Sequence, residues 1–401
     1  MDFPLEYVRG CFPSVKDSSE VFFDNRSAPQ PLASVRATST NGPPDGSAED
    51  LERETRQSLA FFLNSNSEWA DDEIVIAPSA ALLSKRLSAA LSKDYPPSYE
   101  VLTTELDDEG GLEDWKALDA RGGAIRNWAV KRPNAVLDSQ QVDQMLTDQT
   151  RMVVMAKASS SVGSIVELLP VALAVQDHQS SLLINWSAFL PHGAIDIRFL
   201  RSDFIIASTR MFFGAELGFL WGSRERMQKL RVDAPEMFEG LAVPPETLAG
   251  FRAALAYVEE LGLVTQEMQL QPSEDYGRRR HMRRGMQAIR HYERSLTALA
   301  LRRLATVPGL TVFGISDETA AAHRIPHILF RIDGQEPGAL AHTLREQGIH
   351  VGHGNGDAPS LMRALGLDEA TGASCISMLH YNSEKEIEKV ADALHALVPA
   401  R

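Results

Sequence analysis

Short apolar runs alternate with amphipathic stretches over the first two thirds of the chain. Runs that are apolar throughout are typical of strands buried on both faces of a sheet, and the stretches between them repeat with the period of a helix. The expected strands are Ile74–Ala77, Glu100–Thr104, Ala124–Val130, Met152–Ala156, Ser181–Asn185, Asp203–Ala207 and Leu217–Gly222. The expected helices between them include Ala81–Ser92, Gln140–Leu146 and Ser164–Gln176. This order predicts an α/β fold whose large domain is a mainly parallel, seven-stranded sheet sandwiched by helices, with its ligand site at the carboxyl ends of the strands.

The pattern changes in the last third of the chain. Two long helices, Pro245–Leu261 and Tyr276–Ala305, precede a mixed segment with a last helix, Ser383–Leu397, that starts at a capping box of Ser383 and Glu386. We therefore expect a large domain over residues 21–264 and a smaller α+β domain over residues 265–401, on which residues 1–20 pack. The Pro-, Gly- and Ser-rich stretch Thr38–Glu49 is expected to be a surface loop.

Composition narrows the possible partners and location. The 401 residues carry a formal net charge of −14, which argues against a nucleic-acid or anionic-membrane surface. The chain has two cysteines, Cys11 and Cys375, far apart in sequence, so a reducing compartment is expected. We find neither a signal peptide nor an apolar stretch long enough to cross a membrane, so we expect a cytoplasmic protein.

Several short motifs occur in a shared order along the chain. They are Phe22–Asn25 with Pro29–Pro31, Pro191–Asp196, Ser208–Gly218, Phe238–Gly250, Gly354–Ala358 and His380–Ser383. Together they resemble the class V aminotransferase and cysteine desulfurase family of fold-type I pyridoxal phosphate (PLP) enzymes. The resemblance implies a fold-type I large domain, a smaller C-terminal domain, and a homodimer whose active sites lie near the two-fold interface.

The residue at position 211 departs from this resemblance. The segment from Ser208 to Gly218 is similar to the family signature in which a lysine holds PLP, but Met211 stands where that lysine is expected. A thioether cannot form an imine, so the family's chemistry cannot run at this residue. We therefore expect no cofactor.

Further departures fall at positions where the resemblance implies cofactor or substrate contacts. The acidic partner of the pyridine nitrogen falls at Asn185, the stacking aromatic at Asp108, and the substrate-carboxylate arginine at Cys375. Other contacts fall at Ala81, at Ser160, where the resemblance implies an asparagine, and at Ala188. These replacements remove support for the ring, the phosphate and the substrate carboxylate.

The emptied site is expected to remain a cavity that binds a small molecule. We assign acid–base or anion-stabilising roles to Asp108, Lys157 and Arg210. We expect the ligand to contact Arg26, Asn185, Trp186, Met211, His353, Asn355 and Cys375. Alternatives remain open: Lys157 and Arg210 as surface residues, Asp108 on a loop moved into solvent, and Cys375 as a buried hydrophobe. His192 is interpreted as structural, and no metal-binding set is apparent, because His350 and His353 point to opposite faces of an expected strand.

Three functions fit these observations. The preferred hypothesis is a PLP-independent enzyme of specialised metabolism that isomerises, eliminates, cyclises or condenses a small molecule. The alternative is a non-catalytic subunit that pairs with an active paralogue, and the third is PLP binding without a covalent link.

Overall fold

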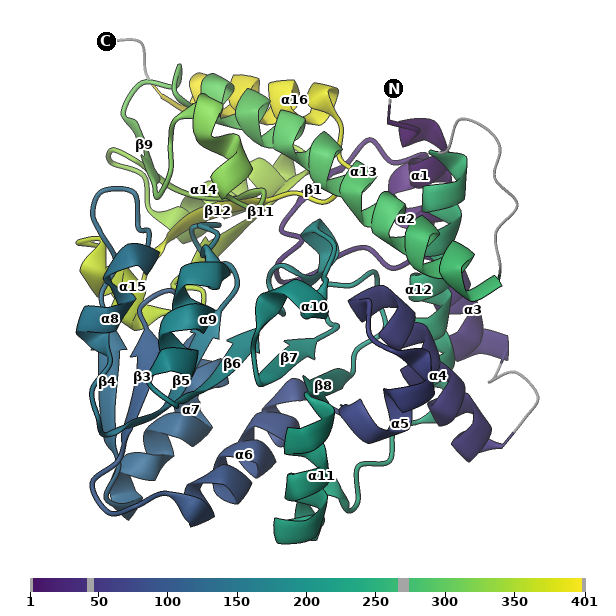
Figure 1. The fold of residues 1–401 in the computed structure, drawn as a ribbon. Coiled ribbons are helices and arrows are strands. Elements are labelled where there is room, and N and C mark those ends of the chain that lie inside the picture. The colour runs from purple at the N-terminus through teal and green to yellow at the C-terminus, as the bar shows by residue number, and fades with distance from the viewer. Residues whose placement is uncertain (1–2, 42–46, 266–273, 399–401) are drawn as a thin grey trace.

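The large domain is built on a seven-stranded sheet (Figure 1), as the sequence predicted. The computed structural model describes residues 3–41, 47–265 and 274–398. The strand order is β2-β8-β7-β6-β5-β3-β4; β8 pairs antiparallel with both β2 and β7, and the other neighbouring strands pair in parallel. The strands are β2 (Ile74–Ala77), β3 (Glu100–Thr104), β4 (Ala124–Trp128), β5 (Thr150–Ala156), β6 (Ser181–Asn185), β7 (Phe204–Ser208) and β8 (Gly218–Gly222).

Helices cover both faces of this sheet. They are α3 (Ala33–Asn41), α4 (Ala48–Leu63), α5 (Ala70–Glu73), α6 (Ala80–Leu91), α7 (Glu109–Lys116), α8 (Val142–Met145), α9 (Leu168–Asp177), α10 (Ile197–Leu200), α11 (Arg224–Asp233) and α12 (Pro245–Val264). Alternate strand residues enter separate cores: Val154 and Leu183 pack with the side chains of α6 and α7, whereas Met155 and Ile184 belong to the core that α9 and α12 share. Burial on both faces explains why these strands are continuous apolar runs.

Short 3₁₀ turns link several of these elements. They are Ser67–Trp69, Ser92–Asp94, Ala117–Arg121, Ser139–Gln141, Leu190–His192, Pro235–Phe238 and Glu318–His323.

The small domain has a five-stranded sheet of order β1-β11-β12-β10-β9. Its strands are β1 (Val21–Phe23), β9 (Leu310–Phe313), β10 (His327–Ile332), β11 (Ile349–Gly354) and β12 (Ala373–Ser377). Its helices, with those of the N-terminal segment, are α1 (Leu5–Cys11), α2 (Pro13–Lys16), α13 (Glu274–Leu304), α14 (Pro337–Glu346), α15 (Pro359–Ala364) and α16 (Glu384–Leu397). In Figure 1 the long helix α13 runs diagonally from α12 of the large domain to the small domain.

The structure departs from the expected organisation in two places. β1 pairs with β11, so the N-terminal contribution to the small domain extends past residue 20, to Phe23. The expected loop Thr38–Glu49 is wrong at both ends, because α3 continues to Asn41 and Ser47 caps α4 by accepting a hydrogen bond from the backbone of Asp50. Residues 42–46 of that loop lie outside the described residues.

Two other expectations bear on the ends of the fold. The capping box at Ser383 and Glu386 is confirmed, with both reciprocal hydrogen bonds present. Among the helices of the described residues, none combines the length and the apolar character needed to cross a membrane.

Candidate active site

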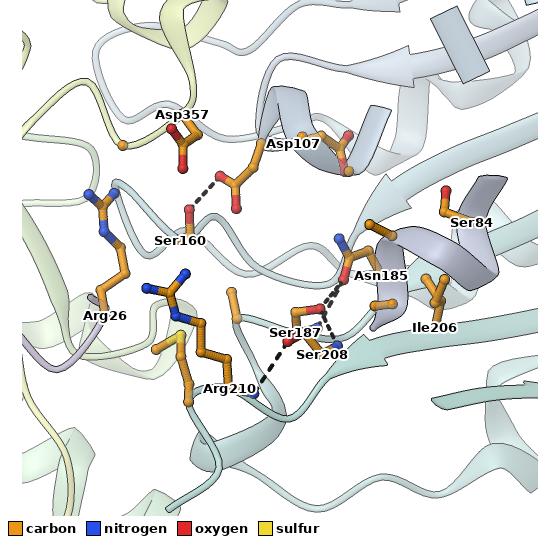
Figure 2. Close-up of a pocket in the computed structure, with 18 of the residues that line it drawn as sticks. Arg26, Ser84, Asp107, Ser160, Asn185, Ser187, Ile206, Ser208, Arg210 and Asp357 are labelled. Atoms are coloured by element: carbon orange, nitrogen blue, oxygen red, sulfur yellow. Dashed lines mark hydrogen bonds between the residues drawn. The ribbon is translucent and has the colours of Figure 1, made fainter. Parts of the chain in front are cut away.

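A cavity of about 390 Å³ opens at the carboxyl ends of β5, β6 and β7 (Figure 2). Its size is at the low end of the range for small-molecule sites. Its floor on the sheet is apolar and comes from Val154, Leu183 and Ile206. Ala80 and Ala81 at the start of α6 face this floor, so the inner part of the cavity is a slot between the sheet and α6.

Asp108 lines this cavity from the start of α7. It stands at the N-cap position of that helix, yet its side chain accepts no capping hydrogen bond. Its Oδ1 instead accepts a hydrogen bond of 2.5 Å from the hydroxyl of Ser160, in the loop that follows β5. Burial and the nearby carboxylate of Asp357 raise the pKa of Asp108 to about 6, against the lowering effects of the Ser160 hydrogen bond and the Arg26 charge.

Asp107, the preceding residue, also lines the cavity and is 6% exposed. Its Oδ2 accepts hydrogen bonds from the hydroxyl of Thr104, at 2.6 Å, and from the Thr104 backbone N–H, at 3.2 Å. Burial, with a contribution from the Asp108 charge, raises the pKa of Asp107 to about 7. Adjacent carboxyl groups with pKa values near neutrality therefore face one cavity.

Arg26 enters from the loop after β1, in the small domain's sheet. Its Nη1 donates a 3.4 Å hydrogen bond to the Ser161 hydroxyl, and its charge acts on Asp108. The loop of Gly356 makes room for it, because a Cβ at residue 356 would stand 2.0 Å from Nη1 of Arg26. The same loop brings Asp357 to the cavity. Both domains therefore contribute charged groups to the site.

Arg210 and Met211 follow β7 at the same edge of the cavity. Nη2 of Arg210 donates a 3.3 Å hydrogen bond to the Ser27 carbonyl, next to Arg26. Met211 is 8% exposed and lines the cavity with its thioether. Of the described residues that line the cavity, none is a lysine.

The end of β6 presents the side-chain amide of Asn185. Its Oδ1 accepts hydrogen bonds from the Ser187 backbone N–H at 3.0 Å and the Ser187 hydroxyl at 2.7 Å. A backbone N–H can only donate, so Oδ1 is the atom that faces Ser187 and Nδ2 is the one that faces the slot. A Cβ at Gly111 would lie 3.2 Å from this Nδ2. The polar end of the slot is therefore a hydrogen-bond donor.

The structure brings together five of the residues predicted for this site: Arg26, Asp108, Asn185, Arg210 and Met211. It does not bring in Lys157 or Trp186, which is a correction. Trp186 follows Asn185, which lines the cavity, and Lys157 comes three residues after the cavity-lining Val154. Because side chains alternate between the two faces of a sheet, both point away from the cavity. The Nζ of Lys157 donates a 2.7 Å hydrogen bond to the Val166 carbonyl, and burial lowers its pKa to about 8.

Three residues of the small domain also lie outside the cavity lining, contrary to the prediction. His353 is exposed near Glu336, and the side-chain amide of Asn355 donates to the Glu369 carbonyl. Cys375 is 2% exposed within β12, where it pairs with Leu329, so it is a buried hydrophobe. His192 is fully buried with Nδ1 2.8 Å from Glu293, which supports its structural role.

The sequence interpretation missed Asp107, Asp357 and Ser187. Asp107 had a signal, because it is the aspartate of the Asp107–Gly111 segment directly before Asp108. A sequence signal for Ser187 also existed, since an asparagine side chain commonly accepts a hydrogen bond from the backbone two residues further on. No sequence signal pointed to Asp357, because it belongs to a loop of the other domain.

Within the part of the chain that is described, no three side chains of ligand type are grouped so that they could hold a metal ion. The arrangement can instead bind an anion at its arginines, accept or donate a proton at Asp108, and donate a hydrogen bond from Asn185.

Comparisons with known proteins agree with the fold. A model of the family of class-V aminotransferases matches residues 36–390. The aminotransferase-like protein FGM3 of Gibberella zeae is 25% identical over 414 residues, which cover 99% of each chain. A probable cysteine desulfurase of Streptomyces coelicolor is 26% identical, over 84% of this chain and 79% of its own.

Solved structures show the same architecture at low sequence identity. The apo cysteine desulfurase of Thermococcus onnurineus NA1 has a TM-score of 0.81 and 18% identity, and the match covers 99% of this chain and 98% of that one. A lysine-to-alanine mutant of C-DES with glycine covalently linked to its PLP cofactor has a TM-score of 0.74 and 17% identity, covering 96% and 98%. By the match over most of its length, the chain belongs to the class-V aminotransferase family.

Proposed function

We propose that this member of the family is an enzyme that moves a proton on a small molecule without PLP, with Asp108 as its acid–base group. The observation that carries the proposal is the placement of Asp108. An aspartate at a helix N-cap ordinarily accepts a backbone hydrogen bond, which contributes about 0.5–2 kcal/mol. Asp108 forgoes this bond and turns its carboxyl towards Ser160 and the cavity.

The acidity of Asp108 suits this role. A general acid–base group works best when its pKa lies near the working pH, and burial raises the pKa of Asp108 to about 6. Ser160 occupies Oδ1, which leaves Oδ2 for a substrate proton. Burial, with a contribution from the Asp108 charge, raises the pKa of the adjacent Asp107 to about 7, so this second carboxyl group of the cavity is partly protonated near neutral pH.

The cavity residues do not fit PLP held as the family holds it. No lysine among the described residues lines the cavity, and Lys157 uses its amine on the other face of the sheet. The mutant of C-DES shows that losing a lysine does not by itself exclude the cofactor. The poor fit to PLP lies at Asn185, whose Nδ2 faces the slot. A protonated pyridine nitrogen needs an acceptor at that place, and the amide offers a donor.

The proposal is tested in two steps. First, the purified protein is incubated with PLP and borohydride, and lysine adducts are sought by mass spectrometry. We expect no adduct on a cavity residue. An adduct that forms stoichiometrically on one lysine, Lys157 included, would overturn the PLP-free part of the proposal.

Second, PLP-free protein is incubated in D₂O with a panel of carbon acids, namely 2-oxo acids, 1,3-diketones and enones, and loss of C–H signals is followed by NMR. We expect exchange by the wild type that falls at least a hundredfold in Asp108→Asn, because general acid–base catalysis contributes about 10²–10⁴-fold. Asp177→Asn, an exposed residue at the end of α9, is the matched control. Exchange that is equal in wild type and Asp108→Asn would contradict the role of Asp108. An absence of exchange with every compound would favour a non-catalytic subunit, and co-purification with an active paralogue would support that alternative.

A further inference from the structure

Arg26 and Arg210 line the cavity with most of their donors unused. Each makes one long side-chain hydrogen bond, Arg26 to Ser161 and Arg210 to the Ser27 carbonyl, although a guanidinium carries five N–H donors. Neither forms an ion pair with another described residue. The contact between Arg210 and Ser27 places the second guanidinium beside the chain segment that carries the first. In Figure 2 both guanidinium groups lie on the left of the view, and Asn185 lies to the right.

We propose that Arg26 and Arg210 bind the carboxylate of a small monoanionic substrate, whose far end carries a hydrogen-bond acceptor that faces Nδ2 of Asn185. This inference rests on the proposed function for the assignment of the cavity as the substrate site. It adds the chemical class of the substrate, and its test measures binding and needs no turnover.

The position of Arg26 supports an anion site that has moved. The family resemblance implies a carboxylate-binding arginine at residue 375, where this chain has a cysteine buried in β12. The backbone N–H of Arg26 donates a 2.8 Å hydrogen bond to the hydroxyl of Ser377, which lies two residues after Cys375 in β12. Arg26 therefore starts from a backbone position close to the place where the family resemblance implies the arginine.

The charges around the arginines favour a single negative charge on the ligand. Arg26 and Asp357 both lie close enough to Asp108 to shift its pKa, the arginine downwards and the carboxylate upwards. With these carboxylates present, two guanidinium groups do not leave an excess of positive charge suited to a dianion. A planar carboxylate matches the fork of an arginine and carries one charge.

The slot defines the rest of the ligand. Val154, Leu183 and Ile206 give it an apolar wall, and Gly111 leaves space beside Asn185. The orientation of the Asn185 amide is set by Ser187, so the donor at the end of the slot is fixed. A flat, largely apolar body with a carbonyl oxygen or an unprotonated ring nitrogen satisfies this donor. A protonated nitrogen would leave two donors facing each other.

Nicotinate is a suitable probe, because it combines a flat ring, one carboxylate and a ring nitrogen that accepts a hydrogen bond. Its binding is measured by calorimetry or saturation-transfer NMR at pH 7.5, beside benzoate, which lacks the acceptor, nicotinamide, which lacks the charge, and inorganic phosphate. We expect nicotinate to bind more tightly than all three, and nicotinamide to bind about tenfold more weakly, since it lacks the negative charge that strengthens hydrogen bonds from a guanidinium.

Variants give changes of opposite sign. Arg26→Met and Arg210→Met should each weaken nicotinate binding about tenfold and leave nicotinamide binding unchanged. Asp357→Asn should strengthen nicotinate binding, because it removes a negative charge from the cavity and asparagine tolerates the positive φ of 57° at this residue. Asn185→Asp should weaken nicotinate more than benzoate. Arg345→Met, an exposed residue on α14, is the control and should change nothing.

Several outcomes would overturn the inference. They are the absence of saturable nicotinate binding, equal binding of nicotinate and nicotinamide, tighter binding of phosphate, and wild-type affinity in both arginine variants. Failure of the proposed function looks different: nicotinate then binds as expected, while Asp108→Asn leaves proton exchange unchanged. If uncharged diketones exchange protons in a way that depends on Asp108 while nicotinate does not bind, the proposed function stands and the inference of a carboxylate-bearing substrate is overturned.

Discussion

The hydroxyl of Ser160 donates a 2.5 Å hydrogen bond to Oδ1 of Asp108. Each of these residues stands where the family resemblance implies a different side chain, an asparagine at 160 and an aromatic at 108. In the fold they lie on separate elements, Ser160 after β5 and Asp108 before α7, and they contact each other at the cavity. This contact supports the proposal that the site serves a different ligand, because independent loss of contacts would not be expected to create a new hydrogen bond.

The acidity of Asp108 has a consequence for stability. In an unfolded chain an aspartate titrates near 3.9, about two units below the value of about 6 in the folded protein. Between these two pH values the folded state binds more protons, so the free energy of unfolding falls as pH rises. Above about pH 6 Asp108 is deprotonated in both the folded and the unfolded state, so the free energy of unfolding stays at its lowered value.

Asp108→Asn should therefore stabilise the protein at pH 7.5. We expect a gain of about 1–2 kcal/mol, discounted for the partial exposure of the residue, and little difference at pH 4. Urea unfolding at both pH values measures the gain. A variant less stable than wild type at pH 7.5 would contradict the raised pKa.

The pKa of Asp108 should respond to its charged neighbours in both directions. Asp357 raises it and Arg26 lowers it. Asp357→Asn should therefore lower the pKa of Asp108, and Arg26→Met should raise it, each by a fraction of a unit to about one unit. NMR titration of ¹³C-labelled aspartate carboxyl groups can follow both shifts. If both substitutions shifted the Asp108 pKa in the same direction, Arg26 and Asp357 would not act on Asp108 as described.

The sheet of the large domain could be predicted closely from the sequence. Glu100–Thr104 and Ser181–Asn185 have the same bounds in the structure as in the prediction, because burial on both faces makes each strand an apolar run that ends at a polar turn. The Thr38–Glu49 stretch was less predictable. Its Pro and Gly residues indicate a turn, but the flanking residues Thr38–Asn41 take helical structure within α3.

The candidate site was predictable only where it follows from strand ends. Asn185 and Met211 were expected at the carboxyl edge and lie there. Lys157 and Trp186 were assigned to the same cavity because they are next in sequence, but the alternation of side chains turns them to the opposite face. Asp357 depends on the packing of the two domains, which the local pattern of the chain does not encode.

The buried amine of Lys157 should be visible in the pH dependence of stability. Its pKa is lowered to about 8 by burial, below the value near 10.4 in an unfolded chain. From about pH 8 to 10.4 the unfolded chain binds more protons, so the free energy of unfolding rises with pH. Lys157→Met should lose this rise of about 1–2 kcal/mol. Its nicotinate binding should equal that of wild type, whereas weakened binding would place the lysine in the cavity after all.

We expect the chain to be a homodimer, as the family resemblance implies. Phe199 on α10 is 69% exposed, and Leu169 on the neighbouring α9 is 51% exposed, so large apolar side chains lie on one part of the surface. Sedimentation velocity at decreasing concentration should show a dimer, and Phe199→Ser should weaken it if these helices contribute to the interface. A monomer that does not depend on concentration would contradict the expectation.

Met211→Lys should not by itself restore cysteine desulfurase activity. The new amine would lie in a largely buried position beside Arg210, where burial and a like charge both lower its pKa and favour the neutral amine that PLP needs. The rest of the site would still oppose the cofactor, because Asn185 offers a donor to the ring nitrogen and Asp108 offers no aromatic surface to the ring. We expect a lysine adduct with PLP after borohydride treatment and no measurable alanine or sulfide from cysteine. Met211→Lys combined with Asn185→Asp should bind PLP more tightly than the single variant, since an acidic partner for the ring nitrogen is then present. Efficient desulfuration by the single variant would show that position 211 alone separates this chain from the PLP-dependent members of its family.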